Sequence, residues 1–376
     1  MHILINCTNL KVGGGLQVAD SVVCQLYRHP QHYFVVALSS FMEETILRLK
    51  RQKVSNVKCL CHDVKNDLNT IIRGRDNFLD KVVEDEEIDV VLTIFGPSRW
   101  NPRCRHLSGF AMPHLVLPES PFFTQMGHLE RTKHTLRSRL LMHFFRRSAD
   151  WFWTENPYIS ERLQRLLPRK KVLTVSNCYN QIFDNPNQWK RDRSLPTFNG
   201  VTCLTISAYY EHKNFKLLPD IARILANKYS DFVFRFALTL TEGQLQVPEE
   251  LRQHFVFLGK VDVTECPSLY EQSDIMLLPS LLECFSASYP EAMRMEVPIV
   301  TTDIEFARGL CGDAACYYSA VDAEAAAEAI YNVATDKEYA AQLVVNGKEQ
   351  LKKFDNYEQR ADKLIRILEE MVVSNN

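Results

Sequence analysis

The chain lacks any run that approaches the roughly 20 consecutive apolar residues of a transmembrane helix. Its opening stretch, Met1 to Ile5, also lacks the basic region and the long apolar core of a secretory signal. The net charge is −2, so the excess of positive charge that marks a nucleic-acid-binding chain is missing as well. These absences predict a cytoplasmic protein that does not bind nucleic acid.

A repeating cysteine spacing is missing too, although the chain contains eleven cysteines. Cys59 and Cys61 alternate as in a strand, and neither they nor Cys311 and Cys316 have the second half-site that a zinc site needs. We therefore interpret the cysteines as reduced thiols. This pattern predicts no metal.

The remaining composition is ordinary for a globular protein, with 46% hydrophobic and 24% charged residues. A length of 376 residues predicts two domains. Strand and helix patterns alternate, which indicates an α/β class with doubly wound parallel sheets. The predicted strands are 2–6, 33–38, 57–61, 89–95, 106–112, 149–155, 171–177, 201–207, 232–238, 255–259, 274–279 and 298–302. The predicted helices are 16–27, 42–50, 69–83, 131–147, one ending at 167, 215–229, 263–273, 286–296, 323–333 and 357–373.

A glycine loop, Gly13 to Gly15, separates the first predicted strand from the first helix. Glycine lets the backbone approach a ligand closely, so this loop is a candidate binding element. It does not have the G-x-G-x-x-G spacing, and no acidic residue ends the second strand as NAD binding requires. A dinucleotide site is therefore disfavoured, whereas a plain turn stays an alternative.

The most informative stretch is Pro279 to Val300, PSLLECFSASYPEAMRMEVPIV, which has the order strand, loop, helix, strand. A helix that begins just above a buried parallel strand points its free N–H groups and positive dipole end at any ligand there, and phosphate is a common one. Two carboxylates, Glu283 and Glu291, lie in this stretch. Full helix between them would give a rise of about 12 Å, too far for a glycosidase pair. They suit two separate contacts to hydroxyl groups instead.

This stretch resembles the E-x7-E signature of family-4 (group 1) retaining glycosyltransferases. The usual form is E-G-F-G-x-x-x-x-E-A-M followed by G-x-P-V-V. The positions that match are Glu283, Phe285, Glu291, Ala292, Met293, Pro298 and Val300. Cys284, Ser286 and Glu296 stand where glycine is common, which bears on sugar preference more than on the fold.

The resemblance implies the GT-B architecture, with two Rossmann-like doubly wound parallel-sheet domains that face a central cleft. Residues 1–185 would form the acceptor domain, 186–356 the nucleotide-sugar donor domain, and the C-terminal helix, about 357–376, would pack back on the first. The resemblance further implies a nucleotide-diphosphate sugar as co-substrate and a glycan or lipid-linked glycan acceptor. No cofactor or metal is required by this pattern, since no Asp-x-Asp ends a predicted strand.

Residue by residue, the resemblance implies catalytic roles for Glu283, Lys213 and His114. Lys213 matches the family's lysine beside the donor diphosphate, and His114 follows a predicted strand of the first domain, with Glu119 as a rival for acceptor contact. The implied donor-binding set is Gly14, Gly15, Lys213, Val261, Glu283, Phe285, Ser286, Ala287, Ser288 and Glu291.

Ala208 is the largest departure from the family, because an arginine usually stands about five residues before the lysine. His212 or Arg294 could supply the missing charge. The departure favours, as an alternative, a catalytically inactive GT-B subunit that binds nucleotide or a partner protein. A GT-B-fold nucleotide-sugar epimerase or phosphorylase is a further alternative, although the fuller His and Arg set that it would need is not evident.

A basic stretch, RTKHTLRSRLLMHFFRR, places several apolar residues on one helical face. One interpretation is a core-facing helix with a solvated basic back. The other is contact with an anionic membrane surface, where a lipid-linked acceptor would lie, which predicts a peripheral protein of the inner membrane face. The basic residues are Arg131, Lys133, Arg137, Arg139, Arg146 and Arg147.

Overall fold

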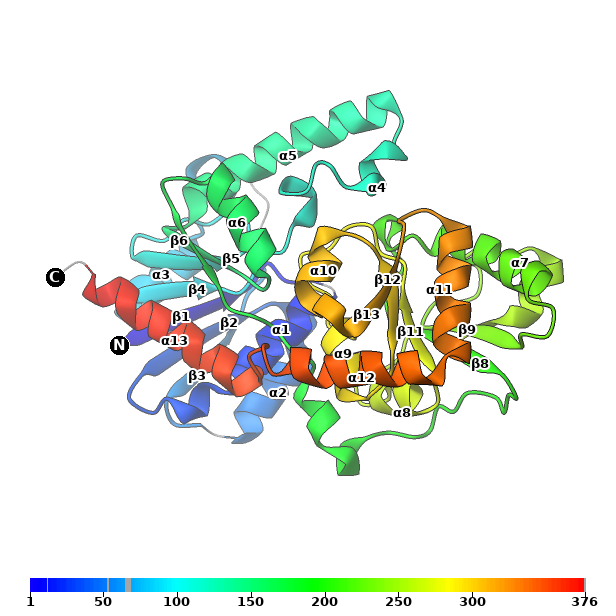
Figure 1. Ribbon diagram of the computed structural model, residues 1–376. Coiled ribbons are helices and arrows are strands. Elements are labelled where there is room, and N and C mark those ends of the chain that lie inside the picture. Colours follow the sequence, from blue (N-terminus) through cyan, green and yellow to red (C-terminus); the bar gives the residue numbers. More distant parts are fainter. Residues whose placement is uncertain (12, 53, 65–68, 375–376) are drawn as a thin grey trace. The chain divides into compact units, whose positions relative to one another are not determined.

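The computed structural model describes residues 1–11, 13–52, 54–64 and 69–374. The chain divides into two compact units (Figure 1). Unit 1 comprises residues 1–118, 126–177 and 355–376, and unit 2 comprises residues 119–125 and 178–354. A short segment from the first half of the sequence, residues 119–125, therefore packs with the second unit.

Unit 1 is built on a seven-stranded parallel sheet with the order β3-β2-β1-β4-β5-β6-β7. Its strands are β1 (His2–Cys7), β2 (Tyr33–Leu38), β3 (Val57–Cys61), β4 (Val90–Thr93), β5 (Arg105–Gly109), β6 (Trp151–Thr154) and β7 (Lys171–Thr174). The order reverses direction between β1 and β4, which is the doubly wound arrangement that the alternating pattern predicts.

Both faces of this sheet are covered by helices, because successive side chains of a strand point to opposite faces. Ile3 and Ile5 pack into a core with α1 and α13, whereas Leu4 packs on the other face with Leu79 of α3. The helices of unit 1 are α1 (Gly14–Val23), α2 (Glu43–Gln52), α3 (Asn77–Asp85), α5 (His128–Ser148), α6 (Pro157–Leu166) and α13 (Tyr357–Val373). The C-terminal helix α13 thus belongs to the core of unit 1.

Unit 2 contains a six-stranded parallel sheet with the order β10-β9-β8-β11-β12-β13. Its strands are β8 (Val201–Thr205), β9 (Phe234–Leu238), β10 (Phe255–Phe257), β11 (Ile275–Leu278), β12 (Ile299–Thr302) and β13 (Ala315–Tyr318). Its helices are α4 (Pro121–Thr124), α7 (Leu218–Lys228), α8 (Cys266–Glu271), α9 (Ser288–Arg294), α10 (Glu305–Cys311), α11 (Ala323–Thr335) and α12 (Lys337–Leu351). Apolar faces of α7 and α11 pack on the strands and form the core.

Several predicted helices differ from the structure. The single helix predicted over 69–83 is wrong. A π-helix, η3 (Asn69–Arg73), ends just before Gly74, which has φ +68, and α3 then begins after its N-cap residue, Asp76. The helix predicted over 16–27 ends at Val23 and is followed by a 3-10 turn, η1 (Leu26–Arg28). Within the described residues, no helix combines the length and the apolar character needed to cross a membrane.

Candidate functional site

The candidate site is formed at the carboxyl end of β11. This strand consists of four buried apolar residues, and the chain leaves it through the buried loop Ser280–Cys284. Ligands of doubly wound sheets bind at this end of the strands. The helix α9 that follows has seven residues and begins at Ser288, two positions after the predicted start.

An ion pair joins two of the predicted residues within unit 2. Lys213 ends the 3-10 turn η7 (Glu211–Lys213), and its Nζ contacts Glu283 Oε1. The same carboxylate oxygen accepts a hydrogen bond from Ser280 Oγ at 2.7 Å. The two charged side chains are 12% and 10% exposed, so the pair is poorly screened by water. The sequence identified both residues, but not that they contact each other.

The loop that carries Glu283 is fastened to its surroundings by backbone contacts. Leu281 N donates to the carbonyl of His212 at 2.8 Å, and Thr302 Oγ1 donates to the carbonyl of Ser280 at 2.6 Å. Ser120 Oγ donates to the carbonyl of Leu281 at 2.6 Å. The loop thus has a defined path at the position where Glu283 leaves it.

Glu291 lies on the first turn of α9 and is buried. Tyr270 OH of α8 donates to Glu291 Oε2 at 3.1 Å. Burial raises the pKa of this carboxyl from 4.5 to about 7, although the Tyr270 hydrogen bond acts in the opposite direction. Glu291 can therefore exchange a proton near neutral pH, whereas Glu283, eight residues earlier, is paired with a cation.

The predicted anion-binding backbone lies between these two carboxylates. No hydrogen bond from the N–H groups of Phe285, Ser286 and Ala287 is found within the described part of the chain. Ser288 is held at the helix start, because its Oγ donates to the carbonyl of Ile206 at 3.2 Å. The N–H groups before α9 are thus available to an oxyanion.

Two suggestions for replacing the missing arginine are not supported. Ala208 is exposed in the loop after β8. Arg294 binds Asp184, with Nε to Oδ1 at 2.8 Å, and so it is already engaged. His212 is a weak cation source, because burial lowers the pKa of its imidazole below the ordinary value, with Glu283 opposing and Lys213 adding to this shift.

Three of the predicted site residues, Gly14, Gly15 and His114, belong to unit 1. Gly13 has φ +78, and α1 begins at Gly14, where an added Cβ would meet open space. At Gly15 a Cβ would lie 3.3 Å from Leu10 Cδ2. His114 lies in the 3-10 turn η4 (Pro113–Leu115), edge to face with His134 at 5.3 Å. In unit 2, Val261 is half-buried after β10.

Sequence reasoning missed two residues that shape the site, Ser120 and Tyr270. It matched Asn214, with Lys213, to the family's K-G/N pair but did not predict the conformation of Asn214. Ser120 and Tyr270 act through tertiary contacts that no local pattern signals. Asn214 has φ +54, a left-handed conformation that asparagine tolerates well, and its buried Nδ2 has no hydrogen-bond partner in the part of the chain described. The Lys-Asn dipeptide before a helix could have indicated such a turn.

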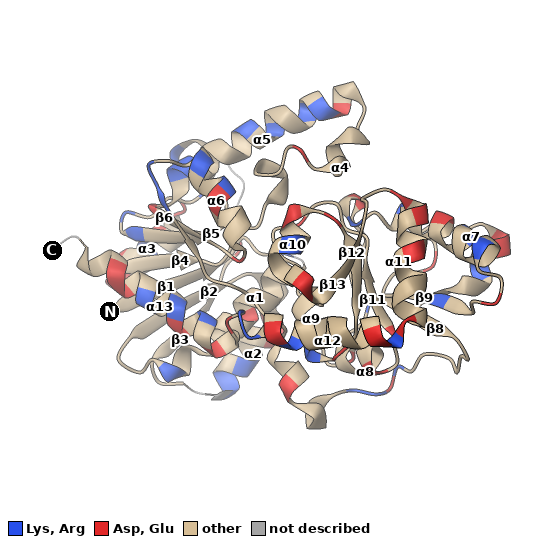
Figure 2. Ribbon diagram, viewed as in Figure 1, with Lys and Arg blue, Asp and Glu red and all other residues tan. Residues whose placement is uncertain are grey.

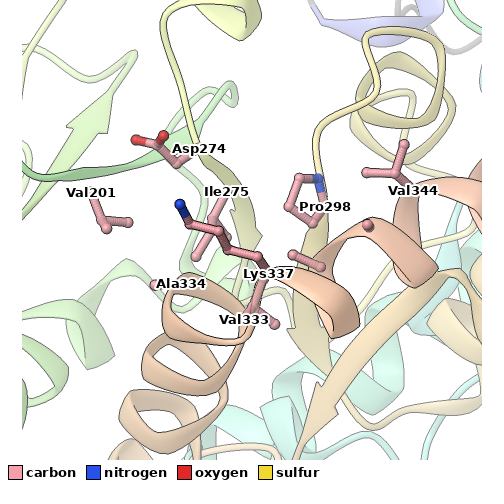
Figure 3. A pocket seen from close by; sticks show the side chains of 10 residues that line it. Val201, Asp274, Ile275, Pro298, Val333, Ala334, Lys337 and Val344 are labelled. Carbon is pink, nitrogen blue, oxygen red and sulfur yellow. The ribbon is translucent and has the colours of Figure 1, made fainter.

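A cavity of about 310 Å³ lies elsewhere in unit 2 (Figure 3). It is lined mainly by apolar residues from the amino-terminal ends of β8 and β11 and from α11 and α12, with Lys337 directed toward Asp274 and Val201. Because it lies at the opposite ends of the strands from Glu283, we do not assign it to the candidate site. Across the described residues, no group of three or more His, Cys, Asp or Glu side chains is placed to hold a metal ion.

Comparison with known proteins places this geometry in context. Residues 200–336 match the family described as Glycosyl transferases group 1. The O-antigen chain mannosyltransferase RfbU of Salmonella typhimurium is 25% identical over 132 residues, which cover 35% of this chain and 37% of that protein. The chain thus aligns with little more than a third of this curated relative.

Solved structures resemble the whole chain. Sucrose-phosphate synthase from Thermosynechococcus elongatus has a TM-score of 0.69 at 13% identity and covers 99% of each chain. A glycosyltransferase from Rickettsia africae has a TM-score of 0.68 at 12% identity, covering 100% of this chain and 99% of that one. Anabaena HepE in complex with UDP and glucose has a TM-score of 0.66 at 14% identity, covering 98% and 99%. These likenesses establish the fold, which confirms the predicted GT-B class.

Proposed function

We propose that this chain, in which residues 200–336 match the group 1 glycosyl transferases on a GT-B fold, is a retaining glycosyltransferase. It would move a hexosyl group from a nucleotide-diphosphate sugar to a glycan or lipid-linked glycan, in cell-surface polysaccharide synthesis. Two relatives support this proposal: one is named for O-antigen chain mannosyl transfer, and another was solved with UDP and glucose.

The Lys213–Glu283 ion pair is the observation that carries the proposal. A lysine held against Glu283, two residues before the first of the free N–H groups ahead of α9, is suited to the charge that develops on a departing nucleoside diphosphate. Glu283 would then accept hydrogen bonds from the donor sugar, and Ser280 would hold one of its oxygens in place. The catalytic assistance is electrostatic and needs no metal in this scheme.

The other predicted residues take binding roles in the same scheme. Glu291 would accept from the ribose hydroxyls, the backbone of Phe285 to Ser288 would hold the diphosphate, and Val261 would lie beside the base. Gly14, Gly15 and His114 of unit 1 would contribute to donor or acceptor binding.

An inactive nucleotide-binding subunit is the second candidate. Ala208 favours it, because the arginine that the family uses at this position is missing. Arg294 is bound to Asp184, and burial lowers the pKa of His212, so neither is well suited to replace that charge. Transfer of the sugar from a donor distinguishes the two candidates.

The first test is a thermal-shift titration with UDP, GDP, ADP and TDP, followed by assay of the corresponding nucleotide sugars. A ligand at 100 times its Kd stabilises by about 2.7 kcal/mol, which raises the melting temperature by several degrees. We expect one nucleotide to stabilise the wild type, and Lys213→Met and Glu291→Gln to lose this shift. Matched controls are Lys216→Met and Glu296→Gln, because both side chains are exposed nearby.

If no nucleotide raises the melting temperature, donor binding at this site is refuted. If one nucleotide binds but none of its sugars is transferred or hydrolysed, the inactive-subunit interpretation replaces the enzyme.

We further propose that α5 contacts an anionic membrane surface. Only Met142, Phe144, Phe145 and Ser148 of this helix are buried. Leu129, Leu136 and Leu140 are 71%, 61% and 57% exposed, so the fully core-facing interpretation is wrong for the first turns. At roughly 100° per residue, these leucines project within a sector of about 40°.

Basic residues are spread along α5 (Figure 2), and helical geometry places them on both sides of this row of leucines. Lys133 and Arg137 lie on one flank of the helix, and Arg139 and Arg146 lie on the other. Arg131 projects from the opposite side, and Arg147 instead donates to the carbonyls of Ile71 and Ile72. An apolar row between cations is typical of a helix that lies in a membrane interface.

The test is sedimentation with vesicles that contain or lack phosphatidylglycerol. We expect binding to the anionic vesicles, weakened by salt, and loss of binding in Leu136→Ser/Leu140→Ser and in Arg137→Gln/Arg139→Gln, because each cation contributes about 1 kcal/mol. Arg131→Gln is the matched control on the opposite side of α5. Equal binding by all variants, or none by the wild type, would refute this surface.

A further inference from the structure

Ser120 makes two hydrogen bonds within unit 2, although the residues on either side of segment 119–125 belong to unit 1. It is the N-cap of α4, where its Oγ accepts from Phe122 N at 3.2 Å. The same hydroxyl donates to the carbonyl of Leu281 at 2.6 Å. A hydroxyl has one donor and two acceptor positions, so both bonds can form together. Ser120 is only 4% exposed.

Ser120 binds Leu281, which lies in the loop that carries Glu283 and also contacts the turn that carries Lys213. Leu281 is fully buried, and its N–H donates to the carbonyl of His212, the residue before Lys213. Its carbonyl is bound by Ser120. Leu281 is therefore tied on one side to the turn that carries Lys213 and on the other to segment 119–125.

A second contact links α4 to the same turn. The Phe122 ring meets the His212 ring edge to face at 6.1 Å, while Tyr210 stacks on His212 at 5.4 Å. Because Phe122 N is bonded to Ser120 Oγ, the hydroxyl fixes α4 as well as the loop. The segment 119–125 thus supports both the lysine side and the glutamate side of the ion pair.

We infer that Ser120 is a positioning residue for the Lys213–Glu283 pair, acting through the Leu281 peptide. Glu283 lies two residues after Leu281, so a displacement of this peptide changes where the carboxylate meets Lys213. Misplacement of a catalytic group by about 1 Å can reduce a rate by a factor of about 100. This inference rests on the proposed function, because the pair acts on a donor only if the chain is a glycosyltransferase.

The experiment compares Ser120→Ala with the wild type in donor turnover and in nucleotide binding. We expect kcat to fall at least tenfold, whereas the Kd for the nucleoside diphosphate changes less than threefold, because Glu291 and the N–H groups before α9 remain in place. Ser120→Thr keeps the hydroxyl and should restore most of kcat. Thr124→Val is the matched control. It removes a hydroxyl from the same helix, and among the described residues this hydroxyl bonds only to the carbonyl of Pro121, at 2.7 Å.

A readout that needs no turnover is the NMR titration of the His212 imidazole, assigned by comparison with His212→Gln. Burial holds the pKa of this imidazole below its ordinary value. Release of the Leu281 peptide and of α4 should expose the ring, so its pKa should rise in Ser120→Ala but not in Thr124→Val.

The outcomes separate the two proposals. A wild type that neither binds a nucleotide nor transfers a sugar refutes the proposed function and the catalytic part of the inference, while the His212 titration still tests whether Ser120 holds the turn. An active wild type with the same kcat and the same His212 pKa in Ser120→Ala overturns the inference. A fall in kcat that Ser120→Thr does not restore, or that Thr124→Val shares, overturns it as well.

Discussion

Glu283 and Glu291 belong to one strand–loop–helix unit, but their surroundings differ in charge. Glu283 contacts a lysine and a serine hydroxyl, whereas Glu291 has a buried tyrosine hydroxyl as its neighbour. Burial without a cation raises the pKa of the Glu291 carboxyl to about 7. The Glu291 carboxyl can therefore bind or release a proton near neutral pH, so a role for Glu291 in binding hydroxyls should depend on pH.

We predict that Tyr270→Phe shifts this dependence. The Tyr270 hydrogen bond lowers the Glu291 pKa, so its removal raises that pKa and leaves less carboxylate at a given pH. If the ionised form accepts from ribose, nucleotide affinity should fall more at pH 6 than at pH 8. Titration calorimetry at pH 6, 7 and 8 measures this change.

Tyr289→Phe is the control for the loss of a buried hydroxyl. Tyr289 is also fully buried, and its OH bonds to Thr301 Oγ1 at 2.9 Å rather than to Glu291. Both variants should lose about 1–2 kcal/mol of stability. A pH dependence of binding that is unchanged in Tyr270→Phe would show that the tyrosine does not tune Glu291.

Single residues of the site were predictable only where a local pattern carries them. Glu283 and Glu291 stand out through the spacing of the strand–loop–helix stretch, and Lys213 through the family's lysine motif. The partners of these residues were not predictable. Tyr270 reaches Glu291 across 21 residues and Ser120 reaches Leu281 across 161, so only the folded chain brings them together.

Elements were predictable where the sequence contains an apolar run or a clear apolar period. The predicted strands of both sheets occur in the structure. Central strands such as β1, β4 and β11 form nearly continuous buried runs, whereas the edge strands β3 and β7 are only partly covered. Helix α12 was missed, since Leu343 and Gly347 alone are described as buried among its fifteen residues and its apolar period is weak. In α5 the apolar residues do repeat, but the first turns have no core to cover, which periodicity cannot reveal.

Helix α13 shows the opposite case, because it is amphipathic and its apolar face completes the core of unit 1. Leu364, Ile365, Leu368 and Met371 all belong to that core, and Asn356 caps the helix in a capping box with Gln359. We predict that Leu368→Ala destabilises unit 1 by about 2–5 kcal/mol, because a fully buried leucine leaves a cavity. Chemical denaturation measures the loss.

Val373→Ala serves as the comparison on the same helix. Val373 is 69% exposed, so its truncation should change stability by less than about 0.5 kcal/mol. Equal effects of the two substitutions would mean that α13 contributes no buried surface to the unit.

Buried titratable groups in both units make the stability of the folded chain depend on pH. The histidine His106 and the glutamates Glu155 and Glu291 do so in opposite directions. In unit 1, His106 donates through Nδ1 to the Ser148 carbonyl and accepts at Nε2 from Thr93 Oγ1 at 2.7 Å. Burial lowers its pKa to about 4, so its contribution is present above pH 6.5 and is lost as the pH falls through 4. Burial raises the pKa values of Glu155 in unit 1 and Glu291 in unit 2 to about 7, although Arg360 attracts the charged form of Glu155.

We predict that each of these two carboxyls makes its own unit less stable as the pH rises. A carboxyl with a folded pKa near 7 and an ordinary pKa of 4.5 contributes its stability below pH 4.5 and loses it as the pH rises through 7. The loss is about 3 kcal/mol at most for each group, or several degrees for a unit of this size.

Glutamine mimics the neutral acid, so Glu155→Gln and Glu291→Gln should match the wild type at pH 5 and melt at a higher temperature at pH 8. Scanning calorimetry measures the transitions, and each variant is the control for the other unit. If Glu155→Gln instead melts lower than the wild type at both pH values, Glu155 is ionised beside Arg360 throughout and its charge stabilises unit 1.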